Sequence, residues 1–187
     1  VLMIKKLIPD YYFKSIYDIP FDKLYENGIR LILTDLDNTL ISYDEELPNE
    51  KLFLLKDKLT EMGFEFILVS NSRKNRVDKF AKNYNIDYVK FSMKPLKRGI
   101  RKAIKKIAKN KYNKNQIILL GDQLMTDVLG AKRYGIEVAL IEAIDKKTDI
   151  GPTRINRRLE GFFLKRIKRR YPSLYNERLK EYDIKKM

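Results

Sequence analysis

The chain has 187 residues, of which 44% are hydrophobic and 35% are charged, an ordinary balance for one soluble domain with a sizeable buried core. It contains no Cys and no His, which excludes disulfides, thiolate nucleophiles, Ser-His-Asp hydrolysis and metals held by Cys or His. Acid–base chemistry near neutral pH must therefore come from carboxylates, Lys or Tyr. A bound metal would be a hard cation held by oxygen, with Mg²⁺ first.

The formal net charge of +15 is unevenly distributed along the chain. Residues 97–114 carry nine Lys/Arg and no acid, and residues 151–187 carry twelve against four acids. Two such basic segments indicate a polyanionic partner, although solvated helix faces would have the same composition. No apolar run is long enough to span a membrane, and the first residues do not resemble a signal peptide. We therefore expect a cytoplasmic protein.

Strand-like and helical patterns alternate from residue 31 onward. We expect strands at 31–33, 64–69, 86–91, 116–120 and 136–141, and helices at 48–62, 73–84, 96–109 and 124–134. Alternation of this kind predicts an α/β fold, a three-layer doubly wound parallel sheet with apolar strands. Gly151-Pro152 suggests a boundary between a core of residues 1–150 and a basic helical extension of residues 151–187, packed on or beside the core.

Polar residues follow three of the predicted strands: Asp35, Ser70 and Asp122. In a parallel sheet the ligand site lies beyond the carboxyl ends of the strands, so these side chains should meet there. Asp35 and Asp37, two positions apart, can act as a nucleophile and as an acid/base. A D-x-D pair alone is weak evidence, and Ser70 alone could be a helix cap.

Further candidates come later in the chain. Lys94, held before Pro95, can neutralise a phosphoryl oxygen, and Asn71 follows Ser70 in the same turn. Asp122 and Asp127 lie in the segment Gly121-Asp122-Gln123-Leu124-Met125-Thr126-Asp127. Carboxylates crowded together repel one another unless a cation lies between them, which favours a bound Mg²⁺ over two helix caps.

These segments occur in the order and spacing of the four motifs of the haloacid dehalogenase (HAD) superfamily, and the resemblance covers roughly residues 28–142. It implies that Asp35 is the nucleophile and a Mg²⁺ ligand, and that Asp37 is the acid/base and offers a backbone carbonyl to the metal. It also implies that Thr39, Ser70 and Asn71 bind substrate and that Lys94 stabilises the phosphoryl charge. Asp122 would complete the metal ligands, and Asp127 would orient a metal-bound water.

The flanking segments extend the resemblance to about residues 7–165. The segment Ile8-Pro9-Asp10, Gly28-Ile29 and the run Thr153-Arg154-Ile155-Asn156-Arg157-Arg158 are similar to the YqeG family of HAD subclass IIIA. Relatives of that family include phosphatidylglycerophosphate phosphatases. The resemblance therefore implies a phosphatase working through a phosphoaspartate, with an anionic phospholipid as substrate.

Two further features bear on the substrate. The intervals from Thr39 to Ser70 and from Ser70 to Lys94 each hold one helix and one strand, so we expect an enzyme without a cap domain and an open site. The stretch 154–170 combines many cations with Phe162, Phe163 and Ile167, which is typical of a helix lying on the inner face of an anionic membrane. The alternative is that these apolar residues pack on the core.

The leading hypothesis is dephosphorylation of phosphatidylglycerophosphate by a peripheral membrane enzyme. A soluble metabolite or a nucleic-acid end is the weaker alternative for the substrate, because no nucleic-acid-binding module is recognisable. A third hypothesis is a basic binding module without catalysis, against which the presence of both Asp35 and Asp37 argues. The sequence does not indicate an oligomeric state.

Overall fold

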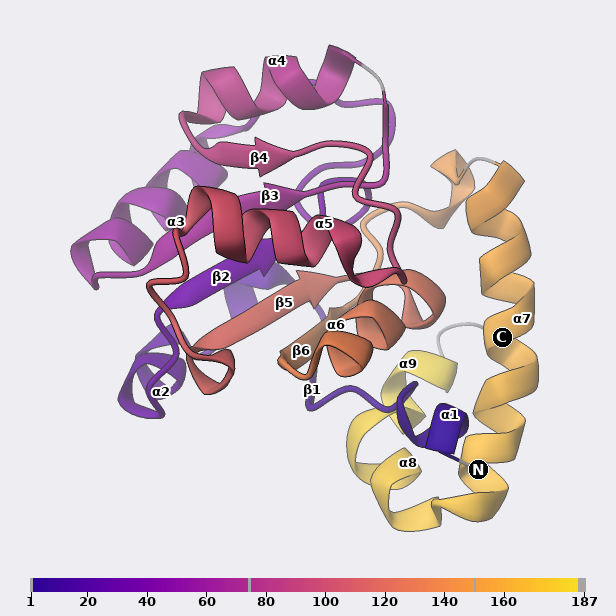
Figure 1. Cartoon of the computed structure of the whole chain (residues 1–187). Coiled ribbons are helices and arrows are strands. Elements are labelled where there is room, and N and C mark those ends of the chain that lie inside the picture. The colour runs from indigo at the N-terminus through magenta and orange to yellow at the C-terminus, as the bar shows by residue number, and fades with distance from the viewer. Residues whose placement is uncertain (1, 74, 150, 185–187) are drawn as a thin grey trace.

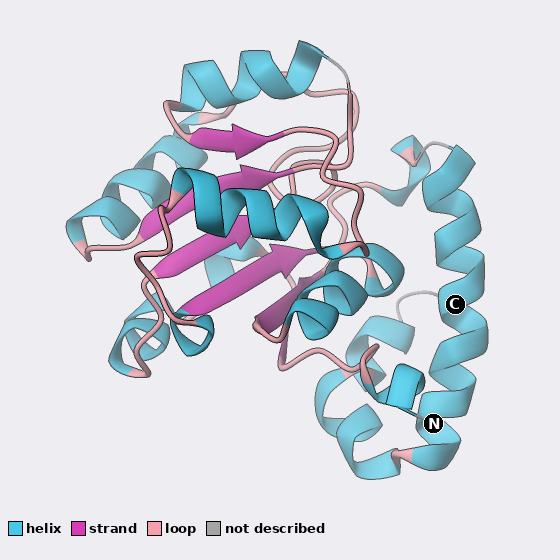
Figure 2. Cartoon of the chain, viewed as in Figure 1, coloured by secondary structure: helices cyan, strands magenta, loops and turns pink. Residues whose placement is uncertain are grey.

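A computed structural model describes residues 2–73, 75–149 and 151–184 of the chain. Its centre is a six-stranded sheet in the order β1-β6-β5-β2-β3-β4, in which every neighbouring pair is parallel (Figures 1 and 2). The strands are β1 (Tyr11–Phe13), β2 (Leu31–Thr34), β3 (Glu65–Val69), β4 (Asp87–Val89), β5 (Ile117–Gly121) and β6 (Glu137–Ile141). The predicted α/β fold with a parallel sheet is confirmed.

Helices connect the strands and follow the last one. The α-helices are α1 (Leu2–Lys5), α2 (Phe21–Glu26), α3 (Glu50–Glu61), α4 (Asn75–Tyr84), α5 (Lys97–Lys102), α6 (Leu129–Tyr134), α7 (Gly151–Arg170), α8 (Pro172–Arg178) and α9 (Lys180–Ile184). Short 3₁₀ turns are η1 (Ile16–Asp18), η3 (Lys114–Gln116) and η5 (Lys146–Thr148), and η2 (Ala103–Ile107) and η4 (Leu124–Val128) are π-helical.

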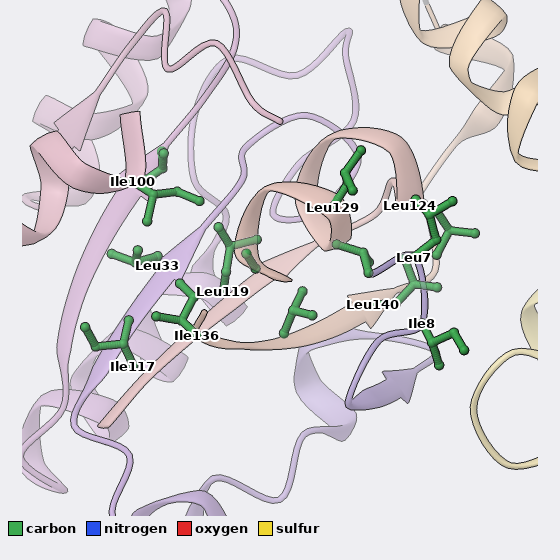
Figure 3. Close-up of a cluster of buried hydrophobic side chains, with 14 of the residues drawn as sticks. Leu7, Ile8, Leu33, Ile100, Ile117, Leu119, Leu124, Leu129, Ile136 and Leu140 are labelled. Carbon is green, nitrogen blue, oxygen red and sulfur yellow. The ribbon is translucent and has the colours of Figure 1, made fainter. Parts of the chain in front are cut away.

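Each face of the sheet is covered, because successive strand residues point to opposite sides. Leu33 and Leu119 belong to a core cluster with residues of α5, η4 and α6, part of which Figure 3 draws. Ile32 and Ile118 belong to a second cluster with residues of α2, α3 and α4. The central strands β2 and β5 are buried along their whole length, which explains why they are apolar throughout.

Strand β1 is an addition to the predicted sheet. Tyr11–Phe13 pairs with Ala139–Ile141 of β6 at one edge, and the phenol of Tyr11 donates a hydrogen bond to Glu137 at 3.0 Å. All three residues are only half-buried, so no apolar run marks the strand in the sequence. These three aromatic residues pack against the two core clusters at the edge of the sheet.

Two of the predicted helices are π-helical over part of their length. The helix expected at 96–109 is α5 followed by the π-helical η2, and the one expected at 124–134 is the π-helical η4 followed by α6. Leu96, the first residue of the helix expected at 96–109, precedes α5 in the structure and is 51% exposed.

The residues after β6 form α7, α8 and α9, and much of this region is packed on the core. The long helix α7 runs beyond the arrowheads of β3, β4 and β5, with α8 and α9 beside its lower end (Figure 1). Leu164, Ile167, Tyr175, Leu179 and Tyr182 belong to the same buried cluster as Leu33. None of the described helices has both the length and the apolar character needed to cross a membrane.

Candidate active site

The chain leaves β2 at Asp35, the first carboxylate at the carboxyl edge of the sheet. The backbone N–H of Asp35 continues the ladder by donating to the carbonyl of Leu120 at 2.9 Å. Asp35 and Asp37 are each 6% exposed, so both are nearly enclosed. Arg76 of α4 forms an ion pair with the carboxylate of Asp37 and also donates to the Ser42 carbonyl at 2.9 Å. Arg76 thereby ties the loop after β2 to α4.

Lys94 lies deep in the same region, with its side chain 1% exposed. Its ammonium nitrogen is 2.8 Å from a carboxylate oxygen of Asp35 and 2.8 Å from one of Asp127. The Asn71 side chain fixes the Lys94 backbone, because its amide oxygen accepts from the Lys94 N–H at 2.7 Å and its NH₂ donates to the Lys94 carbonyl at 2.9 Å. The predicted substrate-binding side chain of Asn71 is therefore occupied in positioning Lys94.

Asp122 and Asp127 enter from β5 and η4, and both are fully buried. The carboxylate of Asp127 accepts from the Gln123 N–H at 3.1 Å, which folds the turn back on itself. Gly121 makes this turn feasible, since a Cβ at that position would lie 2.3 Å from Cγ of Asp127. The glycine in the Gly121-Asp122 pair is thus required by the close approach of the Asp127 side chain.

Three of these carboxylates form one cluster. Asp35, Asp122 and Asp127 each place a carboxylate oxygen within 4.8 Å of the others. The side chain of Asp37 points to Arg76 and is not part of this group. Among the described residues, Oδ1 of Asp122 is buried without a hydrogen-bond partner, and so is Oγ1 of Thr39. Orphaned acceptors beside two other carboxylates are what an oxygen-ligated cation requires.

Burial dominates the electrostatics of the cluster. It raises the pKa of Asp35 to about 7, against the opposing pull of Lys94. Burial also raises the pKa of Asp122 well above its usual range, although Arg157 opposes this effect. For Lys94, burial alone would lower the pKa, but the carboxylates of Asp127 and Asp35 outweigh it and raise the pKa. A cation in the cluster would favour the ionised carboxylates.

Arg157 of α7 is a site residue to which the sequence reasoning assigned no role. Its guanidinium forms an ion pair with the Asp122 carboxylate and donates to the Asp122 carbonyl at 3.0 Å. Its Nε also lies 2.9 Å from a carboxylate oxygen of Asp149. Arg157 is in the run Thr153–Arg158 that carried the finer family resemblance, which was the available signal. Arg76 had no comparable signal, because it contacts Asp37 only through the tertiary fold.

Two of the predicted site residues remain, Thr39 and Ser70. Thr39 and Ser70 are buried, at 1% and 0% exposure, and the Ser70 hydroxyl accepts from the Ser72 N–H at 3.1 Å. Asn38, next to Asp37, donates from its side chain to Asp149 at 2.8 Å. Asp149 accepts from both Asn38 and Arg157 and so connects the loop after β2 with α7.

The parallel sheet, with a buried carboxylate after β2, a buried lysine and two further aspartates after β5, defines a phosphatase of the HAD superfamily. The comparison with known proteins gives the family. A family model described as "Mitochondrial PGP phosphatase" matches residues 1–145, and the chain belongs to this family. It is also 32% identical over 169 residues to "Probable phosphatase YqeG" of Bacillus subtilis (strain 168), covering 90% of this chain and 96% of that one.

Solved structures resemble the fold at low sequence identity. A protein of Listeria monocytogenes serotype 4b is 14% identical, with a TM-score of 0.49, over 67% of this chain and 88% of the other. A protein of Legionella pneumophila described as a HAD superfamily (subfamily III A) hydrolase is 16% identical, with a TM-score of 0.46, over 68% of this chain and 82% of the other.

Proposed function

We propose that this phosphatase removes the terminal phosphate of phosphatidylglycerophosphate at the surface of an anionic membrane, through a phosphoaspartate on Asp35. The observation that supports the chemistry is the buried cluster of Asp35, Asp122 and Asp127 around Lys94. The family match supports the substrate, since that family is described by its action on PGP.

In the proposed reaction a carboxylate oxygen of Asp35 attacks phosphorus and the bond to the leaving oxygen breaks. Asp37 would first leave its ion pair with Arg76 and take up a proton from solvent. It would then give this proton to the leaving oxygen and, in the second step, accept a proton from the water that attacks the phosphoaspartate. Inorganic phosphate leaves, and both carboxyl groups return to their starting states. Lys94, Thr39 and Ser70 stabilise the charge on the phosphoryl oxygens.

The residues present fit a bound Mg²⁺. Asp35 and Asp122 would hold the ion with the Asp37 carbonyl, and Asp127, whose carboxylate belongs to the same cluster, would orient the ion's water or ligate it. Lys94 and Arg157 face four carboxylates, the three of the cluster and that of Asp149, which leaves two negative charges in excess when all four are ionised. A bound dication would balance this excess.

A membrane-facing surface is supported by α7. Ile155, Leu159 and Phe162 form an outward stripe at helical spacing and are 59%, 44% and 55% exposed. Arg166 lies 5.4 Å from the centre of the Phe162 ring, and other cations of α7 flank the stripe. An apolar stripe bordered by Lys and Arg suits an anionic bilayer surface, to which each cation contributes about 1 kcal/mol. Of the three apolar residues named from sequence, only Phe162 is on this stripe, because Ile167 is buried and Phe163 is half-buried.

The test is turnover of phosphatidylglycerophosphate in mixed micelles with Mg²⁺. Wild type should release phosphate, and Asp35→Asn should reduce the rate by at least about a thousandfold, because the nucleophile is lost. Asp57→Asn, at an exposed carboxylate of α3, is the matched control and should behave as wild type. An active Asp35→Asn enzyme would rule out the phosphoaspartate.

Substrate choice needs two further assays. A soluble aryl phosphate and an oligonucleotide with a terminal phosphate should both be poorer substrates than the lipid. If the oligonucleotide were preferred and its turnover fell steeply with salt, the nucleic-acid alternative would replace the lipid.

A further inference from the structure

A large basic cavity lies behind the candidate active site, between α7, α8 and α9. Its volume is about 1000 Å³, and seven of its thirteen lining residues are Lys or Arg, against two Asp. No step of the proposed reaction takes place in this cavity. Its composition alone already indicates an anionic occupant.

Five of the seven cations that line this cavity have no carboxylate partner among the described residues. In the part of the chain that the structure describes, no carboxylate forms an ion pair with Arg154, Arg158, Lys165, Lys168 or Lys180. Both acids already have partners: Asp149 pairs with Arg157, and Asp183 accepts from the Tyr175 phenol at 2.6 Å. These five cations therefore concentrate positive charge that an anionic ligand would complement.

Helix geometry explains why the charges converge. Arg154, Arg158, Gly161, Lys165 and Lys168 are spaced three or four residues apart, so they follow one side of α7. This side differs from the apolar stripe of Ile155, Leu159 and Phe162. The basic side of α7 therefore faces the cavity, and the apolar stripe faces outward.

Gly161 supports a ligand that approaches the helix closely. A glycine inside a helix costs about 1 kcal/mol relative to alanine. Usually a neighbouring element that packs on the glycine justifies this cost, but a Cβ at Gly161 would meet nothing within 4 Å. Because Gly161 has no side chain, there is free space in the cavity wall at the middle of the row of cations.

We propose that this cavity is a phosphate-binding subsite, distinct from the catalytic carboxylates, that takes a phosphate group carried by a lipid headgroup or free in solution. Arg and Lys side chains that are not paired with a carboxylate can bind phosphate oxygens, and Arg does so with two parallel hydrogen bonds. The floor of the subsite includes Arg157 and Asp149, whose other contacts reach Asp122 and Asn38. The subsite is therefore adjacent to the catalytic region.

The experiment measures binding in the full chain carrying Asp35→Asn, by calorimetry at low salt with a chelator. One probe is dihexanoyl phosphatidylglycerol below its micelle concentration, which has a phosphodiester and no hydrolysable monoester. The other probe is inorganic phosphate. Arg158→Glu with Lys165→Glu reverses two charges of the cavity. Arg101→Glu with Lys105→Glu makes the same change at exposed positions of α5 and η2 that form no ion pair with any described residue.

We expect the diester to bind, and we expect the cavity variant to weaken binding at least tenfold while the control pair leaves it within twofold. Parallel loss of inorganic phosphate binding would identify free phosphate as a ligand, and loss of diester binding alone would identify the headgroup. Absence of binding by both probes, or equal weakening in the control pair, would overturn the proposal.

If the charge-reversed chain fails to fold, Arg158→Gln with Lys165→Gln replaces it, with Arg101→Gln and Lys105→Gln as its control. Because catalysis is absent from these measurements, their result is independent of the proposed reaction. A wild-type enzyme that hydrolyses no lipid would refute the substrate and leave the subsite intact.

Discussion

Every buried cation of the candidate active site faces a carboxylate. Lys94 lies between Asp35 and Asp127, and Arg157 lies between Asp122 and Asp149. Pairing is required at these positions, because an unpaired charge in a dry interior costs several kcal/mol. The sequence indicated which carboxylates gather, since they follow strands. It placed Arg157 only within a run of family resemblance and gave it no partner, because α7 reaches the site through the tertiary fold.

Removal of the Arg157 charge should therefore destabilise the metal-free protein. In Arg157→Met the fully buried Asp122 carboxylate loses its partner, at a cost of about 3–5 kcal/mol. For a chain of this size that cost lowers the midpoint of thermal unfolding by roughly 10 °C. Mg²⁺ should restore more of the midpoint in the variant than it adds to wild type, because the ion replaces the missing positive charge.

Arg158→Met is the control for this measurement by circular dichroism. Arg158 is the next residue of α7, is exposed and has no ion pair among the described residues. Its midpoint should stay within about 2 °C of wild type, as for most surface substitutions. An equal fall in the unfolding midpoint of both variants would mean that the Arg157–Asp122 pair stabilises the protein no more than an exposed arginine does.

At the scale of elements, α7 has three different sides. One buries Leu164 and Ile167 in the core, one places cations in the basic cavity, and one exposes the stripe of Ile155, Leu159 and Phe162. The two interpretations of this segment from sequence, membrane contact and core packing, were alternatives only because a periodic pattern does not say which side meets the sheet. The proposed membrane contact now concerns a defined set of residues.

The outward stripe can be tested by sedimentation with vesicles that contain phosphatidylglycerol. Partial burial of each large apolar side chain in the interface contributes about 1 kcal/mol, so Ile155→Ser with Leu159→Ser and Phe162→Ser should weaken binding roughly a hundredfold. Binding should also fall as salt rises, because the flanking cations act through screened attraction.

Leu54→Ser provides the comparison. Leu54 of α3 is 64% exposed, at least as much as any residue of the stripe. Vesicle binding that responds equally to both sets of substitutions, or that does not require anionic lipid, would contradict a specific membrane-facing side on α7.

For the whole molecule, the helices after β6 help to close one face of the sheet. Glu160 accepts from the Leu124 N–H at 2.8 Å and from the Tyr182 phenol at 2.8 Å, so one buried carboxylate joins α7, η4 and α9. Together with the apolar residues in the core, these contacts make the region after residue 150 continuous with the sheet domain. We therefore propose one folding unit instead of a core with a separable extension.

A chain that ends at Asp149 should consequently fail to fold cooperatively. It lacks five buried apolar side chains of the core cluster, each contributing about 2 kcal/mol, and the lost total of about 10 kcal/mol matches the whole stability of a typical domain. A chain that ends at Arg170 keeps α7 and should show an intermediate loss. Soluble yield and thermal unfolding measure both. If the chain that ends at Asp149 unfolded at the same temperature as the full protein, the division into a core of residues 1–150 and an extension of residues 151–187 would be correct.

The sequence by itself determined the parallel α/β fold and the positions of Asp35, Asp122 and Asp127 at the carboxyl edge of the sheet, because strand patterns and the residues that follow them are local. It also determined the superfamily, through four motifs in order. Only the tertiary structure decided what covers these carboxylates, which side of α7 is buried, that Asn71 holds Lys94, and that β1 joins the sheet. Each of those depends on contacts between residues far apart in the chain, whose partners no local pattern specifies.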